Sequence, residues 1–182
     1  LGAIAGYFGG VVDSVIMRTL DIFMSVPDIL FTMAVVVALG SNFTNLLIAL
    51  TLAYFTNYVR LVRSQVLNLS ELEYVEAARA GGSGNVRIIL SHIIPNAVGV
   101  IIVNVTLNIA KIIIYESTLS FLGLGMPPPQ PEWGLMLSEA REFMRKAPFL
   151  LFYPALAIVL CACSVNLVGD GLRDALDPHL KS

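Results

Sequence analysis

Long apolar runs divide the chain into segments that have the length of membrane spans. About twenty apolar residues in a helix cross the hydrocarbon core of a bilayer. The pattern predicts four complete spans, over residues 22–39, 46–66, 93–115 and 149–168. Residues 1–8 are expected to be the end of an earlier span. We therefore expect an all-α polytopic integral membrane protein in which residues 1–182 form a single transmembrane domain.

Prolines stand near the starts of three of these spans. They are Pro27, Pro95 and Pro154. The N–H groups in the first turn of a helix have no intrahelical partner, so a proline is tolerated there. The three prolines are therefore compatible with uninterrupted spans.

A short polar segment separates the second and third spans. Ser70 and Glu73 fit a capping box, and Leu69 and Tyr74 stand where a hydrophobic staple would. Gly82, together with the glycine before it, is a helix terminator. The pattern predicts a short helix that ends at this glycine pair.

A helix of about ten residues is marginal in isolation, so something must hold it in place. Its alanines, Ala77, Ala78 and Ala80, leave little bulk, which suits close insertion into a partner's groove. We expect a docking helix that transmits movement. The alternative is an ordinary interfacial helix between two spans.

The basic residues predict the orientation of the spans, because cytoplasmic loops carry an excess of lysine and arginine. One orientation places these basic residues inside: Arg18, Arg60, Arg63, Arg79, Arg87, Arg173 and Lys181. It leaves Arg141, Arg145 and Lys146 outside, in a loop that also carries acidic residues. Loop 67–92 and the C-terminus are thus expected to be cytoplasmic, and loop 117–148 external.

The composition excludes several kinds of function. The chain is 57% hydrophobic and 13% charged, with a mean hydropathy of +0.80 and a formal net charge of −2. This near-neutral balance, without a basic cluster, argues against a nucleic-acid partner. Cys161 and Cys163 are two positions apart in an apolar run, where neither a disulfide nor a metal site is expected. We expect both to be small core residues.

No residue pattern predicts a catalytic residue, a metal site or a cofactor. The two histidines, His92 and His179, lack the spacing of metal ligands or of a nucleophile and its base. The glycine-rich stretch 81–84 is too short for a phosphate-binding loop and lacks its lysine, so the chain is not expected to bind ATP. The chain begins without Met in apolar sequence, and we expect it to be the C-terminal part of a longer subunit.

Polar stripes run along two of the predicted spans. Residues spaced i, i+4 and i+7 share one helix face, and polar groups in a bilayer usually face a bundle interior or a water-filled path. The stripes are Asn104, Asn108 and Lys111 in the third span, and Thr51, Tyr54 and Tyr58 in the second. In one interpretation they line a translocation path. In the other, they join neighbouring helices by hydrogen bonds.

Three ordered blocks of residues resemble one family of transport proteins. A triplet, a glycine and a proline match the EAA loop of ABC-importer permeases: Glu76-Ala77-Ala78, Gly82 and Pro95. Two further stretches match the peptide/nickel branch of that family: residues 116–134 and 166–178. Together with residues 6–10, these anchors cover essentially the whole chain. The chain therefore resembles the dipeptide and oligopeptide "C-type" permease subunits of binding-protein-dependent ABC importers.

The resemblance implies a type I ABC importer transmembrane domain that forms half of the pathway for dipeptides, oligopeptides or related solutes such as nickel chelates. It implies a paralogous permease as heterodimer partner, cytoplasmic ATP-binding subunits that hydrolyse ATP, and an extracytoplasmic solute-binding protein. The location it implies is the cell (inner) membrane, within the lipid bilayer. The residues it assigns to ATPase coupling are Glu73, Tyr74, Glu76, Ala77, Ala78, Gly82 and Pro95.

The external loop is expected to carry an amphipathic helix over residues 133–146. Its predicted apolar face consists of Trp133, Leu137, Ala140 and Met144. The resemblance favours a shelf that meets the solute-binding protein, with Trp133, Glu139 and Glu142 as contacts. The alternative is a lid at the membrane interface, with Trp133 as its interfacial aromatic residue.

Two features leave alternatives open. Lys111 stands where the family has a small or apolar residue, and it could snorkel outward, pair with Glu116 or face the cavity. Asp170 and Asp174, with Arg173 between them, form either a second contact with the ATPase or a plain helix end with solvated charges.

The competing function is a secondary transporter or channel that is not coupled to an ATPase. Lys111 and the asparagine stripe would then act as ion-coupling groups. Such a protein would not need an alanine-rich docking helix, and acidic groups in the middle of the spans are sparse. A membrane-embedded enzyme, the third alternative, lacks any nucleophile–base or metal-ligand pattern.

Overall fold

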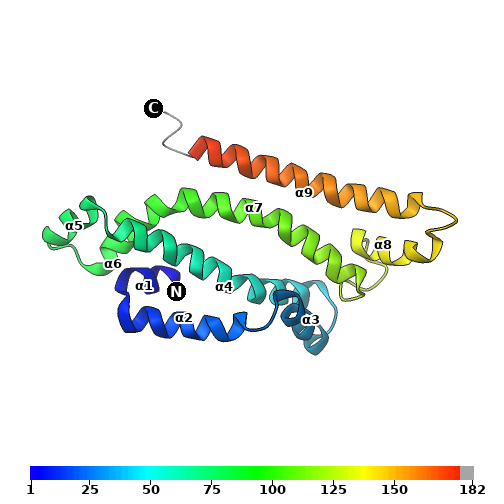
Figure 1. The fold of residues 1–182 in the computed structure, drawn as a ribbon, viewed down its shortest axis with the longest axis horizontal. Coiled ribbons are helices and arrows are strands. Elements are labelled where there is room, and N and C mark those ends of the chain that lie inside the picture. Colours follow the sequence, from blue (N-terminus) through cyan, green and yellow to red (C-terminus); the bar gives the residue numbers. More distant parts are fainter. Residues whose placement is uncertain (177–182) are drawn as a thin grey trace. The chain divides into compact units, whose positions relative to one another are not determined.

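The computed structural model describes residues 1–176, and within this range the secondary structure is entirely helical (Figure 1). The helices are α1 (Gly2–Phe8), α2 (Gly10–Met24), α3 (Asp28–Leu39), α4 (Phe43–Ser70), α5 (Glu73–Ala80), α6 (Asn85–Ile88), α7 (Ile94–Phe121), α8 (Trp133–Ala140) and α9 (Phe149–Leu176). A π-helical turn, Ile89–Ile93, joins α6 to α7, and a 3-10 turn, Arg141–Phe143, follows α8. The predicted all-α class is confirmed.

Three stretches of the described chain are long and apolar enough to cross a membrane: α4, the run Asn85–Phe121, and α9. The number rises to four if α2 and α3, whose axes differ by 76°, count as one bent span. The predicted spans over residues 46–66, 93–115 and 149–168 lie within the first three stretches. These three predictions are therefore confirmed as helices of membrane-spanning length.

The expected uninterrupted helix over residues 22–39 is wrong. α2 ends at Met24, and α3 begins at Asp28, directly after Pro27. A proline lacks the N–H that would continue α2, and it disfavours the helical conformation in the residue before it. α3 alone, with 12 residues, is about 18 Å long, which is shorter than the bilayer core of about 30 Å. A crossing at this position therefore needs residues of α2 as well.

The described residues form two compact units. The first contains Leu1–Val26, Tyr54–Asn104 and residues 173–176, and the second contains Pro27–Ala53 and Val105–Leu172. Both α4 and α7 contribute residues to each unit. The coupling loop belongs to the first unit and the external loop to the second.

Within the first unit, the backbone of α1 lies directly against α4, with no side chain between them at two glycines. A Cβ atom added at Gly6 would lie 2.7 Å from the carbonyl oxygen of Arg63, and one added at Gly2 would lie 2.9 Å from Cβ of Val62. Neither position can accept a side chain without displacing α4. The glycines therefore allow a close contact between the two helices, which fixes α1 on α4.

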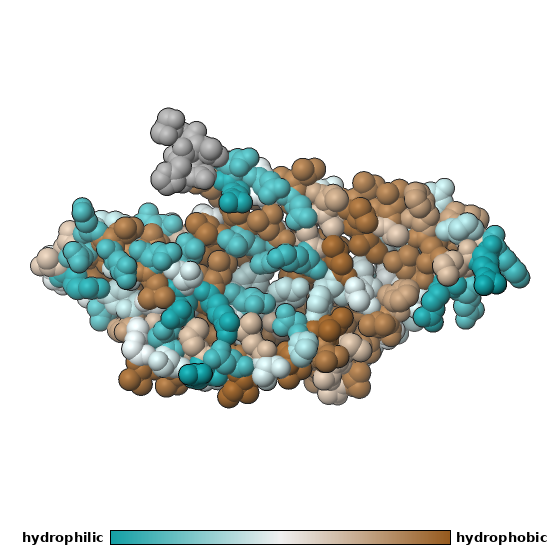
Figure 2. All heavy atoms as spheres, in the orientation of Figure 1, coloured by the Kyte–Doolittle hydropathy of each residue, from teal (hydrophilic) through white to brown (hydrophobic). Residues whose placement is uncertain are grey.

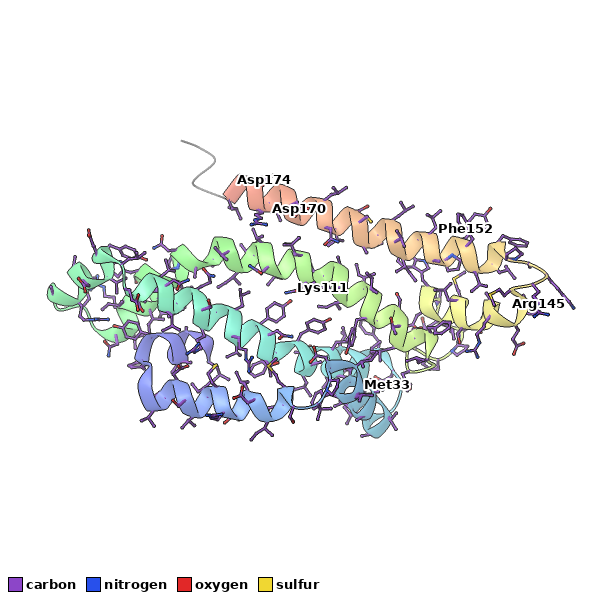
Figure 3. The ribbon with its side chains drawn as sticks, in the orientation of Figure 1. Met33, Lys111, Arg145, Phe152, Asp170 and Asp174 are labelled. Carbon is purple, nitrogen blue, oxygen red and sulfur yellow. The ribbon has the colours of Figure 1, made fainter. Side chains whose placement is uncertain are left out.

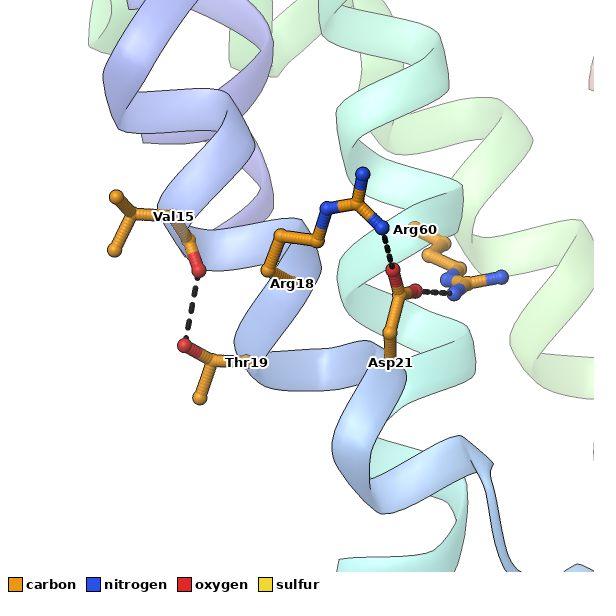
Figure 4. A network of polar contacts seen from close by, with 5 residues as sticks. All are labelled: Val15, Arg18, Thr19, Asp21 and Arg60. Atoms are coloured by element: carbon orange, nitrogen blue, oxygen red, sulfur yellow. Dashed lines mark hydrogen bonds and ion pairs between the residues drawn. The ribbon is translucent and has the colours of Figure 1, made fainter.

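Ion pairs hold α2 on the same part of α4. Nη2 of Arg60 lies 2.5 Å from Oδ1 of Asp21, and Nη1 of Arg18 lies 4.0 Å from the other carboxylate oxygen (Figure 4). Arg63 donates two hydrogen bonds to the carboxylate of Asp13. Sequence reasoning used these arginines only to predict topology. Their acidic partners show that Arg60 and Arg63 also position a helix.

In the second unit, α9 approaches α7 through a glycine. A Cβ atom at Gly169 would lie 2.7 Å from Cδ2 of Leu107. Elsewhere α9 exposes large apolar side chains, including Phe152 and Tyr153, and Figure 2 shows this apolar surface in brown. Large exposed apolar surfaces are typical of regions that contact a membrane or another protein.

Candidate coupling site and external loop

The docking helix begins later than the sequence pattern predicts. α5 starts at Glu73, its N-cap residue is Leu72, and no side chain caps it. Ser70 is still part of α4, and its hydroxyl donates to the carbonyl of Leu67 at 2.9 Å. The predicted capping box is therefore wrong, because a residue in the last turn of α4 cannot take the extended conformation of an N-cap. The staple between Leu69 and Tyr74, which depends on that N-cap, is wrong for the same reason.

The end of the docking helix matches the prediction. Gly81 is the C-cap residue and Gly82 has a φ of +81°, a conformation that glycine adopts without a steric penalty. The N–H of Ser83 donates to the carbonyl of Ala78 at 3.1 Å, and that of Gly82 donates to Arg79 at 3.0 Å. This pair of hydrogen bonds is a Schellman motif, which satisfies the last carbonyls of the helix.

An apolar cluster holds this eight-residue helix. Its fully buried members are Val66 of α4, Val75 of α5, Ile88 of α6 and Ile93 of the π-helical turn. Burial of each such side chain contributes about 1.5–3 kcal/mol. Ala78 packs against this cluster, so it belongs to the inner face of α5. The alanines of α5 therefore do not all share the outer face.

The outer surface of α5, here called the coupling face, consists of exposed residues: Glu73, Tyr74, Glu76, Ala77 and Ala80. It combines two carboxylates, one aromatic ring and two methyl groups. The small alanines permit a partner's backbone to approach closely. The carboxylates near the helix N-terminus stabilise the helix dipole and remain available to a partner. Polar side chains over α5 and α6 appear in teal in Figure 2.

Pro95, the last residue of the motif, is the second residue of α7 and is exposed. The π-helical turn Ile89–Ile93 comes directly before it. A proline in a continuous α-helix would clash with the carbonyl four residues earlier, and a π-turn widens the backbone at that point. Pro95 therefore influences the backbone conformation at the start of α7, and Gly82 determines the backbone conformation at the end of α5.

Two contacts of the coupling loop were missed by sequence reasoning. The hydroxyl of Tyr7 in α1 donates to Oδ1 of Asn85 in α6 at 3.0 Å. The guanidinium carbon of Arg79 lies 5.7 Å from the centroid of the Tyr7 ring. No periodic pattern joins residues so far apart in the sequence. The only signal was the block 6–10, which matches the family and contains this tyrosine.

The external loop begins with a second Schellman motif, at the end of α7. Gly123 has a φ of +82°, and its N–H donates to the carbonyl of Ser120 at 2.9 Å. The N–H of Leu124 donates to the carbonyl of Leu119 at 2.9 Å. The family block that starts at Glu116 therefore encodes a helix end followed by a sharp turn.

A buried carboxylate then holds the loop against α7. Glu132 is only 9% exposed, and its Oε2 accepts hydrogen bonds from the hydroxyl of Ser120 and, at 3.0 Å, from the N–H of Met126. Cβ atoms at Gly125 and Gly134 would lie 2.7 Å from Cβ of Ser120, so both glycines let the backbone approach α7 closely. We call these interactions the Glu132 contact. Sequence reasoning assigned no role to Glu132.

The predicted amphipathic helix over residues 133–146 is only partly correct. α8 ends at Ala140 and a 3-10 turn follows it. Ala140 is buried, but Trp133 and Met144 are 42% and 56% exposed, so they do not form its inner face. α8 packs instead through Gly134 and Ala140, because the Glu132 contact fixes its first turn.

The acidic candidates on this segment, Glu139 and Glu142, are both exposed. Arg145, in the turn that follows, is exposed as well and projects away from α8 (Figure 3). A cavity of about 370 Å³ adjoins the first turn of α8. Apolar side chains of α4 and of the external loop, Trp133 among them, line most of it, together with Glu116 and Glu132.

The residues of the two polar stripes differ in their exposure and in their local hydrogen bonds. Nδ2 of Asn104 donates to the carbonyl of Val100 within α7 at 2.9 Å. Asn108, Tyr54 and Tyr58 are half-buried, whereas Thr51 and Lys111 are exposed. Within residues 1–176, Lys111 and Glu116 do not form an ion pair with each other. Figure 3 marks Lys111 on α7.

Two remaining expectations concern α9. Cys163 is exposed and Cys161 is half-buried, so the expectation that both are core residues is wrong. Asp170 and Asp174 lie on the last turns of α9 (Figure 3) and are exposed. The end of the family block at residues 177–178, as well as His179 and Lys181, lies outside the described residues.

Within the described residues, no three His, Cys, Asp or Glu side chains gather as a metal site requires.

Helices of bilayer length, joined by a short helix with an exposed face of both polar and apolar residues, define a polytopic membrane protein. The whole chain, residues 1–182, matches the family described as "binding-protein-dependent transport system inner membrane component". The chain belongs to this family, as the motif blocks predict.

Individual relatives in this family are named as peptide permeases. The chain is 46% identical over 182 residues to the dipeptide transport system permease protein DppC of Alkalihalophilus pseudofirmus, covering all of the chain and 60% of the relative. It is also 46% identical over 182 residues to the glutathione transport system permease protein GsiD of Pectobacterium atrosepticum, with the same coverage. For the DppC of Haemophilus influenzae the identity is 43% over 181 residues, covering all of the chain and 61% of the relative. The chain thus spans about 60% of the length of the curated relatives it matches.

Proposed function

We propose that this chain is part of the permease subunit of an ATP-driven peptide importer and forms half of its translocation pathway. The observation that carries the proposal is the coupling face, an exposed surface on a short helix that an apolar cluster ties to α4, to α6 and to the π-helical turn before α7. The family match and the names of the relatives support it. The subunit itself is not an enzyme, and ATP is hydrolysed by separate ATP-binding subunits.

The coupling face contacts the cytoplasmic ATPase in this proposal. Ala77 gives the close approach, while Glu73 and Glu76 pair with basic groups of the partner. Closure of the ATPase subunits on ATP displaces α5, and the apolar cluster passes this displacement to the spans. Ala78 supports the helix from within, in place of the direct contact expected from the motif.

The external partner is an extracytoplasmic solute-binding protein, which docks on α8 and the turns around it. The exposed ring of Trp133 and the carboxylates of Glu139 and Glu142 are the proposed contacts. A paralogous permease completes the pathway as the heterodimer partner, and lipid covers the remaining apolar surface. The stripes that contain Asn104, Asn108 and Lys111, and Thr51, Tyr54 and Tyr58, line the pathway.

The solutes we propose are dipeptides, oligopeptides and related compounds, glutathione and nickel chelates among them. The subunit lies in the cell membrane, with loop 67–92 and the C-terminus in the cytoplasm. Cysteines placed at Glu71 and Glu142, in a variant without Cys161 and Cys163, test this orientation. An impermeant thiol reagent added to intact cells should label the second cysteine and not the first. Labelling of both would contradict the orientation.

Co-purification tests the function itself. The tagged full-length subunit, extracted in mild detergent, should carry a nucleotide-binding subunit whose ATPase activity rises with the solute-loaded binding protein. Glu76→Lys should weaken this association because it reverses a charge on the coupling face, whereas Gln130→Ala, in the external loop, should not. Transport by the purified subunit without any ATPase would instead support a secondary transporter or channel.

A further inference from the structure

Tyr7 of α1 contacts both sides of the turn that follows the docking helix. Arg79, the next-to-last residue of α5, places its guanidinium carbon 5.7 Å from the centroid of the Tyr7 ring. Asn85, the first residue of α6, accepts a hydrogen bond from the Tyr7 hydroxyl at 3.0 Å. We propose that Tyr7 is a positioning residue that bridges this turn and sets how much of the movement of α5 reaches the spans.

The turn that Tyr7 bridges has little stiffness of its own. It contains only Gly81, Gly82, Ser83 and Gly84. Cβ atoms at Gly82 and Gly84 would meet nothing within 4 Å, so the turn packs loosely at these positions. Glycine also has the greatest backbone freedom of any residue. Bending of this turn can therefore absorb part of a displacement of α5, and contacts that connect α5 to α6 reduce this loss.

Tyr7 is suited to provide such a contact because its own helix is fixed. The close contacts of Gly2 and Gly6 hold α1 on α4. The Tyr7 side chain also packs against the apolar cluster that contains Val75 and Ile88. A force on α5 thus reaches α6 by two routes, through the cluster and through Tyr7. The second route is directional, because a hydrogen bond and a cation–ring contact both depend on geometry.

This inference rests on the proposed function, because it assigns a role in coupling to an ATPase. Loss of the bridge should leave the subunit folded and its partners bound. It should raise the fraction of ATP hydrolysed without transport. The measurement is therefore the number of solute molecules imported per ATP hydrolysed, for the complete importer with the full-length subunit in liposomes.

Single substitutions separate the two contacts. Tyr7→Phe removes the hydrogen bond and keeps the ring, and Asn85→Ala removes the same bond from the other side. Each should lower the transport-to-hydrolysis ratio by about two- to tenfold, the range that corresponds to one ordinary hydrogen bond. The double variant should be no worse than either single variant, because both remove one interaction. Tyr7→Leu, which removes both contacts, should lower the ratio further.

Matched controls identify effects that do not arise from the bridge. Tyr153→Phe makes the same chemical change at a residue of α9 that is 65% exposed, and it should leave the ratio unchanged. Arg79→Lys keeps a cation near the ring and should retain most of the coupling, whereas Arg79→Met should not.

The outcomes separate this inference from the proposed function. If the parent subunit assembles with no ATPase, the proposed function fails and this inference fails with it. If the complex assembles and Tyr7→Leu keeps the parental ratio, only the role of Tyr7 is overturned. Loss of assembled complex in Tyr7→Phe would also overturn it, since Tyr7 would then be needed for folding. Additive losses in the double variant would show that Tyr7 and Asn85 act separately.

Discussion

The coupling loop and the external loop are held against their neighbouring helices by opposite kinds of interaction. Four buried aliphatic side chains hold α5 against the helices on either side of it. The external loop is held by one buried carboxylate, which accepts two hydrogen bonds, and by glycines that bring the backbone close to α7. Both loops contain a Schellman motif, so the difference lies in the side chains.

This difference has consequences for movement. Apolar contacts are non-directional, and a cluster of valine and isoleucine can shift by small amounts without losing its stabilisation. The cost of burying a carboxylate is offset only while its hydrogen-bond donors stay in place. When the donors move, the carboxylate is left buried and unsatisfied, which is unfavourable. The interactions of the coupling loop thus allow it to move with its partner, whereas those of the external loop keep it in one position relative to α7.

The largest effect is expected from Glu132→Ala. The substitution leaves the hydroxyl of Ser120 and the N–H of Met126 without their acceptor, at about 1–3 kcal/mol for each unsatisfied group. The melting temperature of the purified subunit should fall, and a protease should cut the external loop faster. Glu132→Gln keeps an acceptor oxygen and should be affected less. An unchanged melting temperature for Glu132→Ala would mean that the Glu132 contact does not hold this loop.

A smaller effect should distinguish the inner and outer faces of α5. Ala78→Leu inserts bulk against the apolar cluster, and overpacking of this kind costs about 1–3 kcal/mol. Ala77→Leu adds the same bulk on the exposed side and should leave thermal stability unchanged while it lowers uptake. Measurements of melting temperature and uptake at equal expression compare the two. Equal stability losses in both variants would contradict the assignment of Ala78 to the inner face.

The smallest effect is expected from Lys111→Met. Lys111 lies ten residues before the end of α7 at Phe121, or about 15 Å along the helix. Its long side chain can carry the ammonium group toward water or headgroups. The variant should insert normally and change only the apparent affinity for anionic solutes. Uptake assays with solutes of different charge check this, and abolished uptake with normal ATPase stimulation would make Lys111 essential to the pathway.

Local patterns account for what the sequence could predict. The glycine pair after α5 predicts the helix end correctly, because a Schellman motif depends on a few neighbouring residues. The break at Pro27 also had a local signal, since the residue before a proline avoids the helical conformation. The apolar run has the length of a complete span, and this length favoured a single helix in spite of the proline. The capping box at Ser70 was mispredicted because α4 continues through this residue, and no local pattern shows where that helix ends.

The contacts that cross between elements had no such signal. Glu132 and Ser120 are separated by a proline-rich segment, and a glutamate in an external loop is ordinarily solvated. Tyr7 and Asn85 are separated in the sequence by four helices, α2, α3, α4 and α5. Periodicity reports which face of a helix is apolar, but it does not report which residue of another element meets that face.

Photocrosslinking from the coupling face tests the central claim most directly. A photoreactive phenylalanine analogue in place of Tyr74 keeps an aromatic ring on the coupling face, and the same analogue at Gln130 in the external loop is the control. In the assembled importer, the first should crosslink to the ATP-binding subunit and the second should not. Crosslinking to that subunit from Gln130 but not from Tyr74 would contradict the account, as would its absence at both positions while the ATPase is bound.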